Sequence, residues 1–481
     1  MIKKTFIMVI ISILITCVFS NFIPVEICTA TDENTLYVGG TQTGNYSSIQ
    51  EAIDAASPDD TIFVYSGIYY ENIAINKSII LIGDNNHTTI IDGNGIGTVV
   101  NITGDAVSLQ SFIIRNGGRD YVKFAGISIR SDDCIISKNI IDNNHQGILL
   151  ENTTQNIISF NTMSNNSYSI ALKNSTSAFI INNSIYENFY DGIYLSNCSE
   201  NTIINNTIAN NQQYGIQATY AGPIDKQYRK ESKNNFISKN LINNNKKDGI
   251  YLVLSNQNII KNNSIDNNSG HGILLHGSNN KIYGNIIRNN EYNGILITTK
   301  WYTNSNNNVV ENNIIIGNLE SGIILDDATD DRIIGNKIKN SKHGILLSGI
   351  NNTIAANDIE ENSVTGLGVQ PSSEGNIIYH NNFINNTQNV YEYGENIWDY
   401  NANGNYWSDY TGTDADKDGI GDTPYDIYNP ISEDNLDRYP LIKTYKSPTD
   451  GKKSTPGFEL IIALCAIVLI AYLKQKRIVN H

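Results

Sequence analysis

The residues whose spacing is most specific for chemistry form an acidic loop near the C-terminal end, Asp414-Ala415-Asp416-Lys417-Asp418-Gly419-Ile420-Gly421-Asp422. Asp at the first, third, fifth and ninth positions and Gly at the sixth reproduce most of a calcium loop, in which Ile420 would contribute its carbonyl oxygen. The twelfth position, a bidentate Glu in an EF-hand, is Tyr425, so this is not a standard EF-hand, and Asp426 or Asp409 is a candidate to complete the shell. We expect a structural calcium ion; the alternative is an acidic, solvated turn.

Asp248 and His271 are a second candidate for chemistry. Each stands directly before a Gly-Ile pair, at equivalent positions of two consecutive sequence repeats. A carboxylate and an imidazole held one repeat apart can act as a general acid and base. A solvent-facing turn explains the same residues without catalysis, so both interpretations stay open.

Two insertions interrupt the repeats and carry aromatic and cationic side chains. The first includes Tyr220, Tyr228 and Arg229, and the second includes Trp301 and Tyr302. Aromatic faces stack on sugar rings, and cations pair with sugar carboxylates. Because insertions on repeat scaffolds tend to lie on the functional face, we expect these residues to flank a groove that binds a neutral or anionic polysaccharide. The alternative is that the two loops only pack against the scaffold.

The scaffold that must position these residues is a repeat of about 22 residues. Each copy has a Gly-Ile-x-Leu segment, followed by Asn-x-Ile and an Asn-Asn turn. The Gly positions are Gly126, Gly147, Gly192, Gly215, Gly249, Gly272, Gly294, Gly322, Gly344 and Gly366; the Asn positions are Asn139, Asn161, Asn183, Asn206, Asn240, Asn263, Asn285, Asn313, Asn336, Asn357 and Asn382. The apolar runs are short, β-branched and separated by Asn, Ser and Gly, which favours strands over helices.

One repeat is long enough for three short strands and three corners, and this predicts an all-β fold, the single-stranded parallel β-helix. Asn suits a corner because it tolerates left-handed backbone and can bond to its equivalent in the next coil. In each Gly-Ile-x-Leu strand, Ile and Leu should face inward. The outward positions would then form an apolar stripe. Three explanations stay open: a platform for a ligand, a contact between subunits, or an error in the assigned strand phase. These positions are Tyr194, Tyr251, Leu274, Leu296, Ile324 and Leu346.

The two ends of the chain differ from the repeats. Residues 1–30 have the basic start, apolar run and small-residue cleavage site of a secretory signal peptide. Residues 31–118 should form an N-terminal cap and the first coils, with a helix that begins after Ser48 in a capping box. The repeats then fill 119–390, an aromatic and Asp-rich cap with the calcium loop fills 391–443, a linker fills 444–456, and residues 457–481 form an apolar tail with basic residues at its end.

From the Ser48 helix through the repeats, about residues 36 to 443, the chain resembles the pectin-lyase-like right-handed β-helix superfamily, and most closely its NosD-type and carbohydrate-associated repeat proteins. Pro456-Gly457-Phe458, the apolar tail and the basic residues after it resemble the archaeal PGF-type sorting signal. That resemblance implies an archaeosortase as a partner, transfer to a membrane lipid and display on the cell surface. A plain membrane tail would place the protein on the same outer face.

The composition narrows the possible functions. The net charge of −15 argues against a nucleic-acid partner, which requires a basic stripe. The NosD resemblance implies copper handling for a reductase as a third function. Copper calls for grouped Met, Cys or His, whereas Met163 is the only Met outside the signal peptide and the histidines are scattered, so we expect this function less than the two that follow. We expect non-catalytic recognition of a polysaccharide, a surface glycan or other cell-envelope proteins. The alternative, which the superfamily implies, is a polysaccharide lyase, hydrolase or epimerase.

Overall fold

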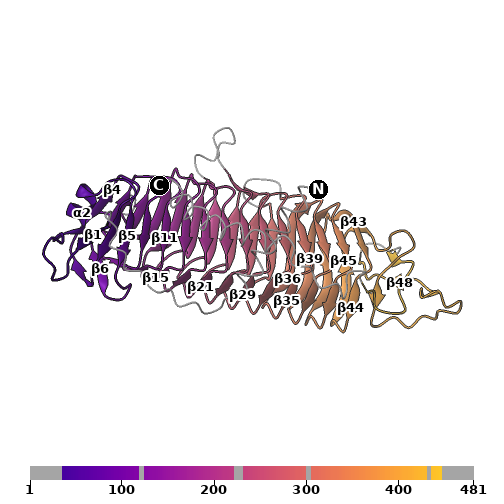
Figure 1. Cartoon of the computed structure of the whole chain (residues 1–481). Helices are drawn as coiled ribbons and strands as arrows, with labels where there is room; N and C mark the ends of the chain where they lie inside the picture. The colour runs from indigo at the N-terminus through magenta and orange to yellow at the C-terminus, as the bar shows by residue number, and fades with distance from the viewer. Residues whose placement is uncertain (1–34, 119–123, 221–230, 300–304, 431–434, 447–481) are drawn as a thin grey trace, which may run out of the picture. The chain divides into compact units, whose positions relative to one another are not determined.

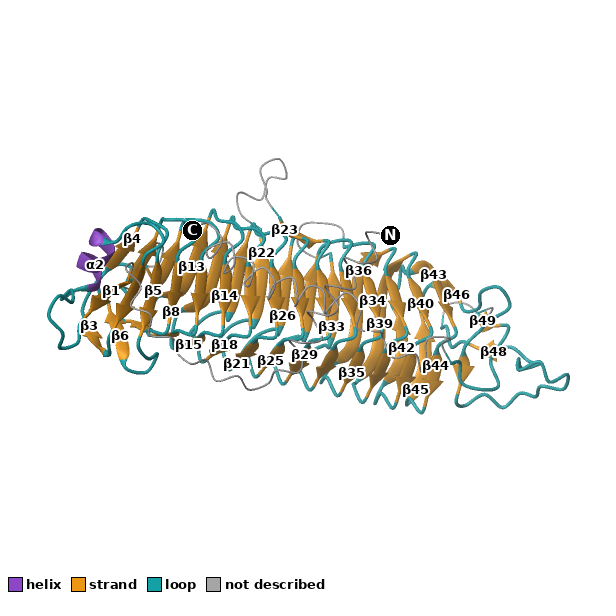
Figure 2. Ribbon diagram, in the orientation of Figure 1, coloured by secondary structure: helices purple, strands orange, loops and turns teal. Residues whose placement is uncertain are grey.

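The computed structural model describes residues 35–118, 124–220, 231–299, 305–430 and 435–446, which apart from Thr35 belong to one compact unit. The chain winds through three strands in each coil, and equivalent strands of successive coils pair in parallel (Figures 1 and 2). Sheet 1 has 16 strands, from β1 (Thr35–Val38) to β46 (Glu395–Ile397). Sheet 2 has 15, from β3 (Gly67–Tyr69) to β47 (Tyr406–Trp407), and sheet 3 has 14, from β4 (Ile73–Ile75) to β45 (Gln388–Glu392). The predicted parallel β-helix is confirmed.

Side chains alternate between the interior and the outer face of each sheet. In β19 (Ile193–Ser196) of sheet 3, Ile193 and Leu195 are buried in the core, and Tyr194 lies half-buried on the outside. Tyr251 occupies the equivalent outer position of β26 (Ile250–Val253) and pairs with Leu274 of the next coil. The predicted strand phase is therefore correct, and the stripe from Tyr194 to Leu346 lies on the outer face of sheet 3.

In most strands of sheet 3 a glycine lies either directly before the first residue or at the second residue, because the coils approach each other closely there. A Cβ atom added to Gly249 would lie 2.5 Å from a side-chain carbon of Ile265 and 2.8 Å from the carbonyl oxygen of Gly272. Both distances are shorter than a carbon atom tolerates. The packing of neighbouring coils thus explains the Gly of the Gly-Ile pattern.

Each of the three corners of a coil contains a column of buried asparagines. Asn263 accepts hydrogen bonds from the main-chain N–H and the side-chain amide of Asn240, both at 3.0 Å, and donates to the carbonyl oxygen of Ile237 at 2.9 Å. The preceding residue, Asn262, has a φ of 53°, a left-handed conformation that Asn adopts readily. These ladders satisfy the polar groups that a tight corner would otherwise leave buried and unpaired.

One position of the predicted ladder is wrong. The column continues from Asn357 to Asn381, whose side-chain oxygen accepts the main-chain N–H of Asn357 at 3.0 Å. Asn382, the position assigned from the sequence, is instead the first residue of β44 (Asn382–Ile384). Two adjacent asparagines made the phase ambiguous here, because only the burial of Phe383 in the core identifies which one begins the strand.

Both ends of the solenoid are covered. At the N-terminal end lies α2 (Ile49–Ala55), whose cap residue Ser48 accepts a hydrogen bond from the main-chain N–H of Glu51 at 3.2 Å, as the capping-box pattern predicts. At the other end, Trp407 lies in a stack between Phe383, at 4.5 Å, and Tyr425, at 4.2 Å. Within the described residues, no helix is long and apolar enough to cross a membrane.

Candidate functional site

Asp248 and His271 lie in consecutive coils of the corner that joins sheet 2 to sheet 3, here called the 2–3 corner. The Oδ1 atom of Asp248 accepts the main-chain N–H of His271 at 2.6 Å. The Nδ1 atom of His271 accepts the main-chain N–H of Asn293, in the next coil, at 3.3 Å. The carboxylate therefore contacts the backbone of His271 rather than its ring, and the ring bonds away from Asp248.

Burial shifts the pKa of both groups. It raises the pKa of Asp248 to about 6, although the hydrogen bond from the main chain of His271 and the positive charge of Lys247 both act to lower this pKa. It lowers the pKa of the His271 ring to about 4. At neutral pH the imidazole is therefore uncharged, and because Nδ1 accepts a hydrogen bond, Nε2 carries the proton. The corner thus presents a carboxylate acceptor and an imidazole donor one coil apart.

Asp191 repeats the arrangement of Asp248 two coils earlier. Its Oδ1 atom accepts the main-chain N–H of Tyr214 at 3.1 Å, and burial raises its pKa to about 7. In both aspartates the second carboxylate oxygen has no hydrogen bond to any described residue. Asn293, in the same column, makes the equivalent bond to Ser321 at 3.0 Å with a neutral amide. The structural role therefore does not require a carboxylate at these positions.

Aromatic rings follow the same corner and the adjoining outer face of sheet 3 over consecutive coils. The ring pairs, with centroid distances, are Tyr168–Tyr190 at 5.0 Å, Tyr168–Tyr194 at 5.6 Å, Tyr214–Tyr251 at 4.4 Å and His271–Tyr292 at 5.5 Å. The Nζ atom of Lys247 lies over the ring of Tyr214, 4.9 Å from its centroid. We call this set of rings, with Asp191 and Asp248, the aromatic run.

The insertion residues are placed only in part. Tyr220 is half-buried and directly follows β22 (Ile216–Thr219), at the edge of sheet 3 opposite the 2–3 corner. Tyr228, Arg229, Trp301 and Tyr302 lie outside the described residues. The groove that these residues would flank therefore remains a prediction.

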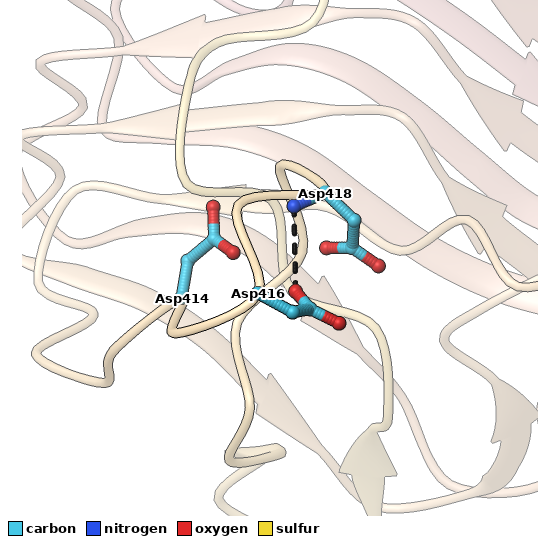
Figure 3. A group of neighbouring side chains, drawn as sticks. All are labelled: Asp414, Asp416 and Asp418. Atoms are coloured by element: carbon cyan, nitrogen blue, oxygen red, sulfur yellow. Dashed lines mark hydrogen bonds between the residues drawn. The ribbon is translucent and has the colours of Figure 1, made fainter.

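The acidic loop brings three of its carboxylates together (Figure 3). Asp414, Asp416 and Asp418 each offer an oxygen within 4.8 Å of the others, and no other group of three or more His, Cys, Asp or Glu residues does so in the part of the chain that the structure describes. The Oδ1 atom of Asp414 is buried and accepts no hydrogen bond. Gly419 has a φ of 94°, as the sharp turn of a calcium loop requires. These features fit a hard cation with oxygen ligands.

Asp422 has a different role in this loop from the other three aspartates. Its Oδ2 atom accepts the main-chain N–H of Ala415 at 2.9 Å and the hydroxyl of Thr413 at 3.1 Å. These two bonds close the loop on itself. The main-chain N–H of Ile420 donates to Asp418 at 2.8 Å, which holds that carboxylate near the turn.

Sequence reasoning missed the start of the aromatic run. Tyr168 directly precedes Ser169, so a search for residues before the strand Gly does not find it. Tyr190 lies two residues before Gly192, whereas Asp248 directly precedes Gly249. Both residues are recognised only when the corners are aligned on their ladder asparagines, Asn166 and Asn188. The signal in the sequence was the number of residues between the ladder asparagine and the strand Ser or Gly, which is two after Asn166 and three after Asn188.

Comparison with protein families gives three matches. The family described as "Periplasmic copper-binding protein (NosD)" matches residues 53–223 and 300–412, which is more than half of the chain. A right-handed β-helix region matches 225–300, and the PGF-CTERM motif matches 455–477, which includes Pro456, Gly457 and Phe458. The motif lies outside the described residues.

Curated relatives match over a short stretch. Proteins described as "Probable ABC transporter binding protein NosD" from Stutzerimonas stutzeri and Pseudomonas aeruginosa are 38% and 39% identical over 98 residues. This is 19% of the present chain and 21% and 22% of theirs, so the chain matches about a fifth of their length.

Among solved structures, the A-module of the Azotobacter vinelandii mannuronan C-5 epimerase AlgE6 aligns with a TM-score of 0.49 and 17% identity, over 67% of this chain and 94% of that one. A mannuronic acid specific polysaccharide family 6 lyase from human gut microbiota aligns with a TM-score of 0.44 and 11% identity, over 67% and 82%. These values carry no inference about activity. By its family matches, the chain belongs to the NosD family of right-handed β-helix proteins, and its PGF-CTERM motif marks it as an exported protein that an archaeosortase processes and that is anchored in the membrane at the cell surface.

Proposed function

We propose that this protein binds a polysaccharide at the cell surface through the 2–3 corner and does not cleave it. The observation that carries the proposal is the aromatic run, in which half-exposed rings continue over consecutive coils. A polysaccharide lying along the solenoid axis would meet a ring in successive coils, about 4.8 Å apart. Stacking on such rings is the usual way to hold the apolar faces of sugars.

The polar groups of the corner suit the hydroxyl groups of such a chain. The second oxygens of Asp191 and Asp248 can accept from sugar hydroxyls, and the protonated Nε2 of His271 and the ammonium of Lys247 can donate to them. A hydrogen bond to a charged acceptor is about twice as strong as a neutral one. The ligand is free polysaccharide or the glycan of another cell-envelope protein, which share this chemistry.

A polysaccharide lyase, hydrolase or epimerase is the second candidate. The observation that favours it is the pair of buried carboxyls whose pKa values burial raises to about 7 and about 6, at Asp191 and Asp248. Burial raises the pKa of catalytic acids in enzymes in the same way. Against it, each carboxylate already bonds the backbone of the next coil, and His271 bonds Asn293 rather than Asp248.

We also propose that the loop 414–422 holds a structural calcium ion. Asp414, Asp416 and Asp418 would supply carboxylate oxygens, and the carbonyl of Ile420 would complete part of the shell. The buried, unpartnered oxygen of Asp414 supports this assignment, because an unpaired buried carboxylate oxygen is costly without a cation. The ion would stiffen the cap that carries Trp407 and Tyr425.

Copper, which the family description implies, does not fit the described residues. Copper favours grouped thiolate, thioether and imidazole ligands. Cys134, Cys198 and Met163 are fully buried in the core and come from different coils. Among the described residues, the one cluster of three possible metal ligands consists of Asp414, Asp416 and Asp418, and it contains no His or Cys. The donor set of the described residues therefore suits calcium better than copper.

One experiment separates recognition from catalysis. The full chain, solubilised in detergent with calcium, would be incubated with neutral and uronic-acid polysaccharides. Bound protein, chain length and the ratio of C-5 epimers among the uronic acids would be measured, because an epimerase leaves the chain length unchanged. Binding with no change in chain length or epimer ratio supports the proposal. A change in either that disappears in Asp248→Asn and Asp191→Asn would establish the enzyme instead, and neither binding nor any such change would refute both.

A further inference from the structure

A pocket opens at the N-terminal end of the aromatic run. It has a volume of about 350 Å³ and is lined by Asn143, Asn144, His145, Asn165, Ser167, Phe189 and Tyr190. These residues come from three consecutive coils of the 2–3 corner, between β12 (Ile140–Asp142) and β19. The volume falls within the range of small-molecule sites.

The pocket lies where the corner changes length. Two residues separate the ladder asparagine from the next strand glycine or serine after Asn144 and Asn166, whereas three residues do so after Asn188. The longer corner carries Phe189, whose side chain is 61% exposed, and Tyr190, which stacks on Tyr168 of the shorter coil. A step between corners of unequal length is a physical reason for a hollow on an otherwise regular solenoid.

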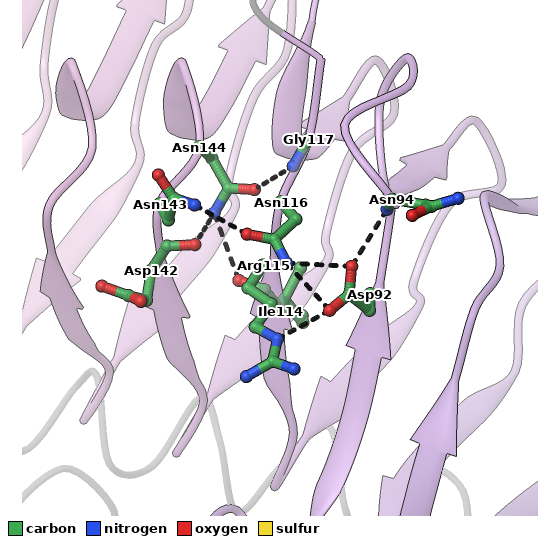
Figure 4. Close-up of polar contacts among 9 residues, drawn as sticks. All are labelled: Asp92, Asn94, Ile114, Arg115, Asn116, Gly117, Asp142, Asn143 and Asn144. Carbon is green, nitrogen blue, oxygen red and sulfur yellow. Dashed lines mark hydrogen bonds and ion pairs between the residues drawn. The ribbon is translucent and has the colours of Figure 1, made fainter.

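Hydrogen bonds to the preceding coil fix the polar wall of the pocket (Figure 4). The side-chain amide of Asn143 donates to Asn116 at 2.7 Å, and the side-chain oxygen of Asn144 accepts the main-chain N–H of Gly117 at 2.9 Å. Asn116 is in turn held by two bonds to Asp92, at 3.0 and 2.8 Å. The wall is therefore built before any ligand arrives, which lowers the entropic cost of binding.

Several polar atoms of the lining are unused. The side-chain oxygens of Asn143 and Asn165 accept no hydrogen bond from described residues, and neither the hydroxyl of Ser167 nor that of Tyr190 makes one. The side-chain amide of Asn165 is occupied by Asp142, at 2.8 Å. The pocket thus offers amide acceptors and hydroxyl groups beside an exposed aromatic ring, and no Asp, Glu, Lys or Arg side chain lines it.

We infer that this pocket binds one uncharged sugar unit of the polysaccharide, so that the ligand of this protein is a neutral polysaccharide rather than a uronic-acid chain. Amide oxygens and hydroxyls match sugar hydroxyls, and Phe189 can stack on the ring. A uronate carboxylate would be desolvated in the pocket with no Lys or Arg side chain of the lining to pair with it, which is costly. The inference rests on the proposed function and adds the substrate class to it.

The test compares variants of the full chain, in detergent, for equilibrium binding to mannan, galactan and dextran and to alginate and polygalacturonate. Phe189→Ala should weaken binding of a neutral polysaccharide about tenfold, the equivalent of one stacking contact. Phe189→Trp should retain it. Phe160→Ala is the matched control, because Phe160 is 58% exposed on the corner between sheets 1 and 2, and it should leave binding unchanged.

The outcomes distinguish this inference from the proposed function. Binding of uronic-acid chains alone, or of neutral chains with equal affinity in wild type and Phe189→Ala, overturns the inference and leaves the polysaccharide proposal standing. Binding to none of the five polysaccharides counts against both. Loss of binding in Phe160→Ala as well as Phe189→Ala would show a non-specific effect and would also overturn the inference.

Discussion

Asp331 lies in an asparagine ladder next to Asn308 and accepts its main-chain N–H at 2.7 Å, with the side-chain amide of Asn308 at 3.3 Å. Its other carboxylate oxygen is buried and has no hydrogen-bond partner. Asn352, the next residue of the ladder, donates from the equivalent position to the carbonyl oxygen of Ala328 at 3.0 Å. Asp331 can make such a bond only when it is protonated.

The first prediction is therefore that Asp331→Asn stabilises the protein, and more so at high pH. Burial raises the pKa of Asp331 from 3.8 to about 7. A carboxyl whose pKa rises on folding contributes full stability below pH 3.8 and loses it as the pH rises through 7. Urea unfolding of wild type and variant should differ little at pH 4 and by a few kcal/mol, in order of magnitude, at pH 8.

The exposed Asp327 gives the control for this prediction. Asp327→Asn removes one negative charge from the same coil, as Asp331→Asn does, but the side chain that it alters is exposed rather than buried. It should leave the unfolding free energy nearly unchanged at both pH values. An equal effect of the two substitutions, or a stabilisation by Asp331→Asn that does not grow with pH, contradicts the account of the ladder.

The second prediction concerns a ladder asparagine. Asn206 accepts two hydrogen bonds from Asn183 and donates to the carbonyl oxygen of Ile180 at 2.8 Å. Asn206→Ala leaves these buried groups unpaired, each at a cost of about 1–3 kcal/mol. We expect a loss of about 3 kcal/mol in denaturant unfolding. The exposed Gln212→Ala of the same coil should lose almost nothing, and similar losses for both would refute the role assigned to the ladder.

The third prediction concerns calcium. Removal of calcium with a chelator should lower the thermal unfolding midpoint of the wild type, because a ligand at 100 times its Kd stabilises by about 2.7 kcal/mol. In Asp416→Asn the midpoint should respond little to calcium. Asp426→Asn, an exposed acid outside the three-carboxylate group, should respond like the wild type. A wild-type midpoint that ignores calcium at all concentrations would leave loop 414–422 as an ordinary acidic turn.

The fourth prediction is that polysaccharide binding weakens in acid. An ionised Asp248 accepts sugar hydroxyls more strongly than a protonated one, and its pKa is about 6, so affinity should fall as the pH drops through 6. Asp248→Asn should bind more weakly at pH 8 and depend less on pH. The pKa of Asp191 is about 7, so this residue should account for the remaining dependence. Isothermal titration at pH 5 and pH 8 measures both effects, and identical pH profiles for the two proteins would contradict the role of Asp248.

The fold could be predicted from the sequence because each coil repeats the same physical requirements. A glycine such as Gly249 is needed where coils touch, an asparagine such as Asn263 where a corner buries polar groups, and Ile where the strand faces the core. The ladder position at Asn381 was misassigned because Asn382 carries the same side chain. Only the packing of Phe383 separates the two.

The candidate site was less predictable, because it depends on departures from the repeat. Asp248 and His271 were identified from their shared position, but the sequence does not reveal that the carboxylate bonds the His271 backbone. The pocket beside Phe189 depends on corner length, which residue type alone does not indicate. The acidic loop was recognisable because calcium imposes its own spacing on Asp414, Asp416 and Asp418.

If the aromatic run binds polysaccharide, Tyr214→Ala and Tyr251→Ala should weaken equilibrium binding of the polysaccharide. Tyr283→Ala is the matched control, because Lys261 lies over Tyr283 at 4.8 Å, as Lys247 does over Tyr214, but on sheet 1. We expect the affinity for the bound polysaccharide to fall about tenfold in each of the first two variants and not in the third. Equal affinity in all four proteins would contradict this role of the aromatic run.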